Sequence, residues 1–433
     1  MTSSWVPDVT PESPFSLANI PFGIISTKDE PTPRPAVAIG THALDLKALD
    51  GGIGLGEIVP ELKGHEHVFQ QTTLNAFAAL GRPIHQQVRK ALRDLLTSGS
   101  SSQVAQQLQE NAELRQKALI PLSQVKMHMP MAIGDYTDFY AGYHHAFAVG
   151  SMFRGPAAAL QPNYTHLPVG YHGRASSIVV SGTPVRRPWG QILLDPAAKP
   201  KQPTTAPCRR LDFELELGCF ISKSNEQGTP VGIDEAEHHI FGYVLLNDWS
   251  ARDIQSWEYV PLGPFNSKNF ASTISPWVVL ADALEPFRTK GIENKTPVQD
   301  YMKEKKAETA IDINLEVDIT TPEGDTTTIT RTSAKQLMWS FPQMIAHHTL
   351  GGCNMRTGDM LGSGTISGTE PDARGSLLEL SEGGKKDVML YGMDMRRFLK
   401  DGDTITLRGT CGGSGERVGF GECTGRIYSA IQR

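Results

Sequence analysis

Cysteine is scarce in this chain of 433 residues. The five cysteines, Cys208, Cys219, Cys353, Cys411 and Cys423, form an odd number, and no two of them have the C-x-x-C spacing. A disulfide framework needs paired cysteines, and a zinc ribbon needs closely spaced ones. The sequence therefore predicts free thiols in a reducing compartment.

Long apolar runs are also missing. The longest are short segments such as Trp277–Leu280, whereas a transmembrane helix needs about 20 apolar residues. The first residues, Met1–Trp5, have neither the basic nor the apolar part of a signal peptide. We therefore expect no membrane segment and a cytoplasmic location.

Neither sign of charge dominates, because 41 Lys and Arg face 47 Asp and Glu, for a net charge of -6 without basic blocks. This balance argues against nucleic acid and anionic membranes as partners. The chain has no P-loop, no H-E-x-x-H and no G-x-S-x-G, and its glycine clusters do not follow the dinucleotide pattern G-x-G-x-x-G. These common cofactor and protease classes are therefore not expected.

Glycine and proline are abundant: 42 Gly and 29 Pro make about 16% of the chain against a usual 12% or so. They separate short alternating runs, of which Leu211–Leu217 and Ile311–Ile319 are the clearest. Pro322–Asp325 then predicts a turn into a second strand at Thr326–Thr330. The pattern indicates a mainly β protein with some helix.

The first part of the chain has its own organisation. Short strands are expected at 35–40 and 43–46, followed by the glycine-rich stretch Gly51–Gly56. Apolar residues on one face predict a helix over 84–96, and Ser98–Gln109 is expected to be a polar connection. We place a boundary near residue 125, which gives domains over 1–125 and 126–433.

A further helix is expected within Ser333–Leu350, where Pro342 either kinks the helix or marks its start.

Three carboxylates share one face of the run Leu211–Leu217, because side chains alternate along a strand: Asp212, Glu214 and Glu216. If that face is open to water, the run is an ordinary amphipathic strand. If the face is covered, a positive group must neutralise the carboxylates.

Another acidic residue lies at the end of a strand that the sequence predicts to be buried. The continuous apolar run Phe241–Leu246 leads into Asn247–Gln255, and Asp248 lies where the strand leaves the core. Carboxylate oxygens are the ligands that Ca²⁺ and Mg²⁺ accept, so the covered alternative would suit a hard cation.

A third group of polar residues surrounds a histidine pair. Asp138 and Tyr140 precede His144 and His145, and Arg154 follows them. One such histidine is more often a surface or core residue than a catalyst, but the neighbouring Asp138 and tyrosines favour a site. Lys268 and Glu379 are further candidates.

At this point the sequence resembles the fumarylacetoacetase family, also called fumarylacetoacetate hydrolases. The resemblance extends from about residue 15 to 425 and is carried by the segments Phe15–Gly23, Asp135–Tyr140, His166–Ser177, Asn247–Pro264 and Ser363–Gly368. It implies a small SH3-like N-terminal barrel followed by a large mixed β-roll that forms a homodimer and carries the active site.

The resemblance also implies the metal ligands. Asp138, Glu214, Glu216 and Asp248 match positions that bind Ca²⁺, whereas Asp212 matches none and is expected beside the ligands or at the surface. A second cation, Mg²⁺, is implied near Asp248, the Lys268 backbone and the hydroxyl of Ser272. Here the chain departs from the family, because Ala271 replaces a glycine and restricts the backbone.

The reaction that the resemblance implies is hydrolysis of the carbon-carbon bond of 4-fumarylacetoacetate to fumarate and acetoacetate, the last step of tyrosine and phenylalanine catabolism. His145 would be the base, oriented by Glu379, and Arg252, Gln255 and Lys268 would stabilise the oxyanion. The implied contacts to the diketo acid substrate are Tyr140, Arg154, Tyr171, Gln255, Tyr259 and Thr365. Two alternatives are another reaction of oxo-acids on the same fold and a metal-stabilised scaffold without catalysis.

Overall fold

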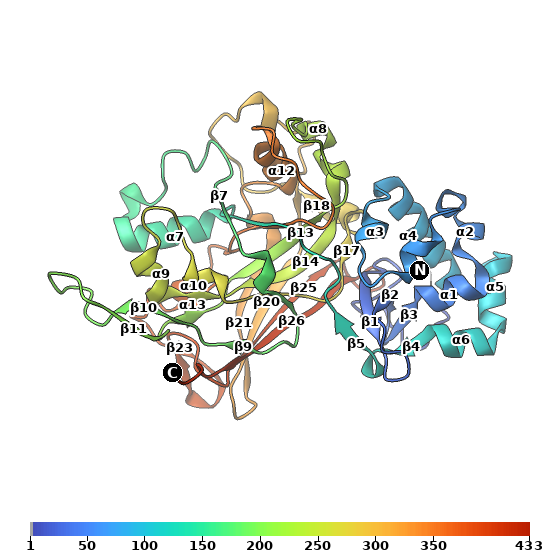
Figure 1. Cartoon of the computed structure of the whole chain (residues 1–433), viewed down its shortest axis with the longest axis horizontal. Coiled ribbons are helices and arrows are strands. Elements are labelled where there is room, and N and C mark those ends of the chain that lie inside the picture. The colour runs from blue at the N-terminus through green and yellow to red at the C-terminus, as the bar shows by residue number, and fades with distance from the viewer. Residues whose placement is uncertain (1–2) are drawn as a thin grey trace.

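A computed structural model describes residues 3–433 as a mixed α/β molecule with many strands. Figure 1 shows the N-terminal region, in blue and cyan, packed at one end of a larger region that contains the long strands. The prediction of many short strands is confirmed, whereas the predictions of an SH3-like barrel and of a boundary near residue 125 stay predictions.

The N-terminal region contains a five-stranded antiparallel sheet in the order β4-β3-β2-β1-β5. Its strands are β1 (Phe22–Ser26), β2 (Arg34–Ile39), β3 (His42–Asp45), β4 (Leu119–Pro121) and β5 (Lys126–His128). The two strands expected at 35–40 and 43–46 are thus β2 and β3.

This region is more helical than the sequence suggests. The expected helix is α4 (Arg82–Leu96), which buries Val88, Leu92, Leu95 and Leu96 on one face. The glycine-rich stretch after β3 lies within two helices, and Ser98–Gln109 is not a plain connection, because Ser102 caps a helix that buries Ala105 and Leu108. The remaining helices are α1 (Leu46–Ile53), α2 (Leu55–Ile58), α3 (Asn75–Ala78), α5 (Gln103–Glu110) and α6 (Ala112–Ala118).

The centre of the larger region is an eight-stranded mixed sheet in the order β7-β6-β22-β13-β14-β16-β8, with β17 also paired to β14. Its strands are β6 (Tyr136–Phe139), β7 (Gly170–His172), β8 (Ile178–Val180), β13 (Leu215–Ile221), β14 (Ile240–Asp248), β16 (Ser272–Ile274), β17 (Val279–Leu280) and β22 (Met360–Gly362). The strand expected at 241–246 is β14, and Asp248 is its last residue.

A second sheet of five strands has the order β21-β20-β25-β26-β9. Its strands are β9 (Val185–Arg186), β20 (Asn314–Thr320), β21 (Thr326–Ser333), β25 (Thr404–Cys411) and β26 (Val418–Tyr428). The antiparallel pairing of β20 with β21 confirms the predicted hairpin around the turn at 322–325.

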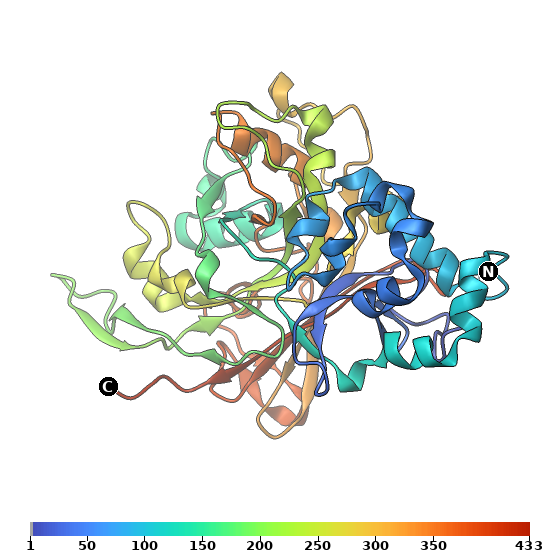
Figure 2. The ribbon, with the colours of Figure 1, turned by 45° about the vertical axis from the view of Figure 1, so that its right-hand side comes forward.

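The remaining strands of residues 3–433 form four two-stranded sheets. They pair β10 (Trp189–Leu193) with β11 (Pro203–Pro207), β12 (Leu211–Asp212) with β15 (Ser250–Ala251), β18 (Arg288–Thr289) with β19 (Ala310–Ile311), and β23 (Val388–Met389) with β24 (Met395–Arg396). The β10–β11 hairpin protrudes from the body of the molecule (Figure 2).

Short helices connect these strands: α7 (Tyr143–Arg154), α8 (Ile233–Ala236), α9 (Arg252–Glu258), α10 (Asn266–Asn269), α11 (Ala281–Leu284), α12 (Phe341–Thr349) and α13 (Leu377–Leu380). In α12, Pro342 lies in the first turn and Ser340 forms a capping box with Gln343, so this proline marks the start of the helix and does not kink it.

Strand β14 has apolar side chains on both faces, because it is covered on both sides. Tyr243 and Leu245 belong to the same core as residues of the sheet β21-β20-β25-β26-β9. Val244 and Leu246, on the other face, pack in a core shared with the N-terminal region. The strand that ends in Asp248 is therefore held between the two.

Two segments near the ends of the chain, 15–19 and 417–419, also meet. Phe15 forms a β-bridge with Val418, the hydroxyl of Ser16 donates to the carbonyl of Arg417 at 2.7 Å, and the amide of Asn19 donates to the carbonyl of Gly419 at 2.7 Å. Among residues 3–433 no helix has the length and apolar character needed to cross a membrane.

His85 lies at the contact between α4 and the central sheet. Its Nε2 donates to the carbonyl of Phe77 at 2.9 Å, and its ring packs edge-on against Phe241 of β14 at 5.0 Å between centroids. Burial lowers the pKa of His85 to about 4, since a charged imidazole would lose its hydration here.

We expect the stability of the chain to fall in acid partly because of His85. Between about pH 6.5 and pH 4 the unfolded chain binds a proton at His85 that the folded chain does not, so the free energy of unfolding decreases as the pH falls. His85→Gln should lose less stability from pH 7 to pH 5 than the wild type, by on the order of 1–2 kcal/mol. Denaturant unfolding at both pH values measures this difference; equal losses would contradict the assignment.

Candidate active site

The pairing of the central sheet brings carboxylates from separate segments to one edge. In the register, Asp138 of β6 lies opposite Gly362 of β22, which lies opposite Gly218 of β13, two residues after Glu216. Across β13, Glu216 lies opposite Leu246 of β14, two residues before Asp248. Neighbouring strands are about 4.8 Å apart, so the three carboxyl groups converge.

The converging carboxylates are Asp138, Glu216 and Asp248, which are buried and offer oxygens that all lie within 4.8 Å of one another. Among the described residues, Asp138 Oδ1 and Glu216 Oε1 have no hydrogen-bond partner. A Cβ at Gly362 would lie 2.5 Å from Asp138 Oδ1 and 3.1 Å from Glu216 Oε2, so glycine leaves space between these side chains. Unpaired buried oxygens in this arrangement fit a hard divalent cation.

Burial and mutual repulsion act on these three carboxyls together. Burial raises the pKa of Asp138, and the nearby charge of Asp248 raises it further; burial likewise raises the pKa of Glu216, with Asp138 and Asp248 adding to the shift. Burial also raises the pKa of Asp248, because its effect outweighs the opposing charge of Lys268. A bound cation would reverse these shifts by stabilising the ionised carboxylates.

Glu214 faces a different set of partners, although the family resemblance places it among the ligands. Its carboxylate forms ion pairs with the ammonium group of Lys268 and with Arg252 Nη1, the latter at 2.9 Å, and its Oε1 lies 3.8 Å from His145 Nε2. Burial alone would raise its pKa, but these positive neighbours hold the pKa below its usual range. The ligand role of Glu214 stays a prediction.

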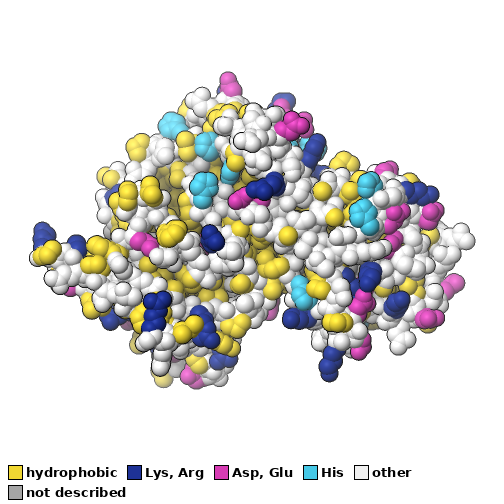
Figure 3. All heavy atoms as spheres, viewed as in Figure 1, with side chains coloured by type: hydrophobic (Ala, Val, Ile, Leu, Met, Phe, Trp, Pro, Cys, Tyr) yellow, Lys and Arg dark blue, Asp and Glu magenta, His cyan; other side chains and the backbone are white. Residues whose placement is uncertain are grey.

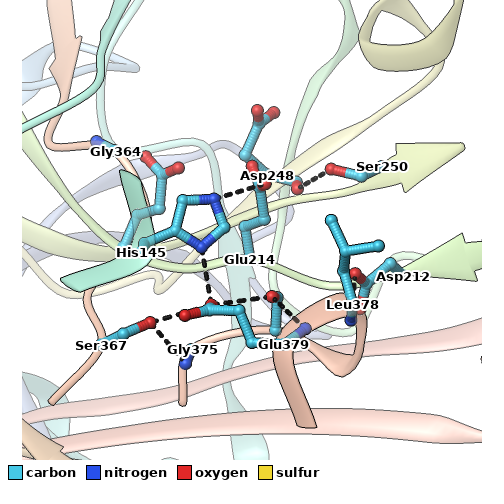
Figure 4. Close-up of polar contacts among 12 residues, drawn as sticks. His145, Asp212, Glu214, Asp248, Ser250, Gly364, Ser367, Gly375, Leu378 and Glu379 are labelled. Atoms are coloured by element: carbon cyan, nitrogen blue, oxygen red, sulfur yellow. Dashed lines mark hydrogen bonds and ion pairs between the residues drawn. The ribbon is translucent and has the colours of Figure 1, made fainter. Parts of the chain in front are cut away.

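His145 and Glu379 form the central hydrogen bond of the site (Figure 4). His145, near the start of α7, donates from Nδ1 to Glu379 Oε2 at 2.6 Å, and both side chains are buried. Ser367 and Ser376 each donate to the same Glu379 oxygen at 2.9 Å. Burial alone would raise the pKa of Glu379, but His145 and the two hydroxyls lower it below its usual value, so Glu379 stays a carboxylate that orients the imidazole.

Arg252 and Gln255 project from the first turn of α9. Arg252 Nη1 lies 3.3 Å from Gln255 Oε1, and Nε donates to Asp212 at 2.8 Å. The remaining nitrogen, Nη2, is buried and has no hydrogen-bond partner among the described residues. A buried guanidinium nitrogen with a free donor is suited to a developing negative charge.

Lys268 and Ser272 both contact Asp248. The Lys268 ammonium lies 2.5 Å from Asp248 Oδ2, and the Ser272 hydroxyl donates to Asp248 Oδ1 at 2.9 Å. The pKa of Lys268 is raised because the charges of Asp248 and Glu214 outweigh its burial. The structure thus brings the residues implied for a second cation next to Asp248, with Ala271 buried beside them.

The six residues implied for substrate binding are not equally close to this centre. Tyr140 packs edge-on against His145 at 5.6 Å between ring centroids, and Tyr171 donates to Asp248 Oδ2 at 3.3 Å. Thr365 is buried and follows Gly364, whose N–H donates to Glu216 Oε2 at 3.0 Å. The Arg154 guanidinium donates to the carbonyls of Ala158 and Ala159, and Tyr259 lies in an exposed loop. Their substrate roles stay predictions.

The burial of Asp212 shows whether the carboxylate face of the run Leu211–Leu217 is exposed or covered. Asp212 is fully buried, as are Glu214 and Glu216, so the alternative of a water-exposed strand face is wrong. The run Leu211–Leu217 is also not one continuous strand, because β12 ends at Asp212 and β13 begins at Leu215. The break turns Asp212 toward Arg252 and away from the three converging carboxylates.

Sequence reasoning missed the supporting residues of the site. Tyr136 is buried, and a Cβ at Gly362 would lie 3.0 Å from its hydroxyl, yet tyrosine in a strand carries no sequence signal for such a place. Ser376 has no sequence signal either, and Ser367 stands out only as part of the segment Ser363–Gly368, without a role of its own. Only their hydrogen bonds to Glu379 reveal what they contribute.

Comparison with known families places this site in a defined class of proteins. Residues 136–428 match the model of the fumarylacetoacetate hydrolase C-terminal domain, and residues 18–130 match that of the fumarylacetoacetase N-terminal domain. The chain belongs to the fumarylacetoacetase family.

Curated relatives match this chain over its whole length. The fumarylacetoacetase of Aspergillus fumigatus is 59% identical over 432 residues, and that of Mus musculus is 48% identical over 430 residues; each alignment covers 99% of both chains. The fumarylacetoacetase of Arabidopsis thaliana is 47% identical and covers 97% of both chains.

Solved structures share the fold at low sequence identity. A fumarylacetoacetate hydrolase from Exiguobacterium antarcticum matches with a TM-score of 0.52 at 15% identity, covering 95% of this chain and 99% of that one.

The carboxylate cluster should bind a divalent cation that stabilises the folded chain. Ca²⁺ at 100 times its Kd should add about 2.7 kcal/mol to the free energy of unfolding, seen as a higher Tm. The double variant Asp138→Asn with Glu216→Gln should lose this increase, because it removes two of the three converging charges. The control variant Asp300→Asn, at an exposed position, should keep the Ca²⁺-dependent rise in Tm. A double variant whose Tm rises with Ca²⁺ as much as that of the wild type would exclude a cation at this edge.

Proposed function

We propose that this chain hydrolyses the carbon-carbon bond of 4-fumarylacetoacetate to fumarate and acetoacetate, the last step of tyrosine and phenylalanine catabolism. The observation that carries the proposal is the His145–Glu379 hydrogen bond of 2.6 Å beside a buried carboxylate cluster, in a chain of this family. Full-length relatives that are named fumarylacetoacetase support the same reaction.

His145 acts as the general base. Because Nδ1 donates to Glu379, the nitrogen left to accept a proton from water is Nε2. Glu379 fixes this tautomer and stabilises the imidazolium that forms, and the two serine hydroxyls hold Glu379 in place. The deprotonated water then forms a bond to the carbonyl carbon on the fumaryl side of the substrate.

Arg252 would stabilise the alkoxide that this attack creates. Its unpaired Nη2 is a preorganised donor. Gln255, whose Oε1 accepts from Arg252 Nη1, would offer its amide NH₂, and the Lys268 ammonium, which donates to Asp248, would be the third donor. When the carbon-carbon bond breaks, the electron pair passes to the departing carbon as an enolate, which takes up a proton to become acetoacetate. Removing one oxyanion donor typically slows such a reaction by a factor of about 100 or more.

The cation that suits this cluster is Ca²⁺, held by Asp138, Glu216 and Asp248, with Glu214 as the fourth ligand. When bound, it supplies Lewis-acid stabilisation of the substrate's oxygen atoms. A second cation, Mg²⁺, is proposed beside Asp248, the Lys268 backbone and Ser272; the hydroxyl of Ser272 at 2.9 Å from Asp248 supports it.

Substrate is proposed to lie against Tyr140, Tyr171 and Thr365, with Gln255 and Tyr259 completing its contacts. Arg154 would bind a carboxylate end of the diketo acid, because its planar guanidinium suits two-point contact. To reach the substrate, it would exchange its present bonds to Ala158 and Ala159 for the carboxylate.

The remaining features of the proposal concern the whole molecule. The N-terminal region would be an SH3-like domain with its boundary near residue 125. The chain would work in the cytoplasm, where its five free cysteines remain reduced.

A homodimer is supported by apolar surface near the site. Figure 3 shows hydrophobic side chains over the left-hand part of this face, where Figure 1 places α7, α9 and the β10–β11 hairpin. Leu262 is 95% exposed, and Val260, Phe265 and Phe153 are each about two-thirds exposed. Exposed apolar residues in such numbers are typical of a protein interface.

The reaction is tested by following the loss of absorbance of the conjugated diketone when purified protein meets fumarylacetoacetate, with and without a chelator. We expect turnover that the chelator abolishes. His145→Ala should lose turnover while it keeps the Ca²⁺-dependent rise in Tm. Faster turnover of acylpyruvates than of fumarylacetoacetate would overturn the substrate assignment, and an active His145→Ala would overturn the role of the base.

The dimer is tested by sedimentation velocity. The wild type should sediment at twice the chain mass of 47.2 kDa, and Leu262→Glu should shift the population toward single chains because it places a charge in the apolar surface. A wild type that sediments as a single chain at micromolar concentration would contradict the proposal.

A further inference from the structure

We propose that Asp212 is a positioning residue that links the oxyanion donor Arg252 to the segment that carries Glu379. One of its oxygens binds Arg252, and both bind the backbone of the Glu379 segment. This role rests on the proposed hydrolysis. Asp212 matches no ligand position and lies outside the group of converging carboxylates.

Asp212 is a fully buried carboxylate that accepts four hydrogen bonds. Its Oδ1 accepts from the backbone N–H groups of Phe213 at 2.9 Å and Leu377 at 2.7 Å. Its Oδ2 accepts from the N–H of Leu378 at 2.9 Å and from Arg252 Nε at 2.8 Å. Each oxygen accepts two hydrogen bonds, so these contacts fix the orientation of the carboxylate.

Three of these four donors, those of Arg252, Leu377 and Leu378, come from distant parts of the chain. Arg252 begins α9, whereas Leu377 and Leu378 begin α13, the short helix that contains Glu379. Figure 4 shows Asp212 next to Leu378, with Glu379 on the same segment extending toward His145. A shift of Asp212 therefore moves the orienting carboxylate and the oxyanion donor together.

The charge of Asp212 also determines how Arg252 is shared. Arg252 Nε pairs with Asp212 and Nη1 with Glu214, which leaves Nη2 as the free donor. Without Asp212, the guanidinium could turn and pair with Glu214 through two nitrogens, as planar guanidinium groups commonly do with carboxylates. The free donor would then be lost from the reacting centre.

An asparagine at position 212 cannot reproduce these contacts. Its amide group has one oxygen, and its NH₂ would face either the two N–H groups now at Oδ1 or the N–H and guanidinium now at Oδ2. Asp212→Glu keeps the charge but moves it by one methylene. The two variants thus separate loss of the charge from loss of its position.

The test compares both variants with the wild type in the fumarylacetoacetate assay, with rates given per folded molecule. We expect kcat to fall about 10- to 100-fold in Asp212→Asn while KM changes by less than threefold, because Asp212 does not touch the substrate. Asp212→Glu should recover part of kcat. In combination with Arg252→Gln, Asp212→Asn should reduce kcat by a smaller factor than it does alone, since the part of its effect that acts through Arg252 is already lost and only the part through the Glu379 segment remains.

The matched control is Asp403→Asn. Asp403 is also fully buried, and each of its oxygens accepts a hydrogen bond from Arg396 at 2.8 Å. It also accepts from the N–H of Lys400 at 2.8 Å, but it lies outside the site. We expect this variant to lose stability while the folded fraction keeps the wild-type kcat. The control separates the loss of a buried ion pair from the loss of a positioning contact.

Several results would overturn the role of Asp212. They are a wild-type kcat in folded Asp212→Asn, full additivity with Arg252→Gln, an equal loss of kcat in Asp403→Asn, or failure of both Asp212 variants to fold when Asp403→Asn folds. A wild type without turnover would instead contradict the proposed hydrolysis, so the two failures are distinguishable.

Discussion

The burial of many negative charges at one sheet edge is the constraint on which the rest of this structure depends. Asp138, Glu214, Glu216 and Asp248 are all buried there, and the nearby fixed positive charges are Lys268 and Arg252. An unpaired buried carboxylate is strongly unfavourable, so a cation that completes the charge balance stabilises the fold as well as the reaction. In the proposed mechanism, stability and catalysis thus depend on the same few oxygens.

That constraint explains the division of work around the site. Three carboxylates converge with oxygens of Asp138 and Glu216 that lack hydrogen-bond partners among the described residues, which suits a cation. Other buried carboxylates have fixed donors and position neighbouring side chains. Glu379 holds His145, and Asp212 holds Arg252. The same residue type therefore serves two purposes, and its hydrogen-bond partners decide which.

The sequence predicted elements with strong periodicity and residues with strong chemistry. Helix 84–96, the hairpin at 311–330 and the buried strand ending at Asp248 follow from local pattern, and the resemblance supplied the residues that the fold brings together. The break after Asp212 could not be predicted, because it depends on Arg252 and on the backbone of Leu377, both distant in sequence. The helix after Ser102 was missed for a related reason, since its few apolar residues are buried by tertiary packing.

The contact between segments 15–19 and 417–419 has a consequence for synthesis in the cell. Ser16 and Asn19 bind carbonyls about 400 residues later, on or next to β26. At about 5–20 residues per second, a ribosome needs roughly 20–80 s to deliver those partners. The first segment of the protein therefore leaves the ribosome long before its own binding site exists, and the molecule is closed only when its last strand arrives.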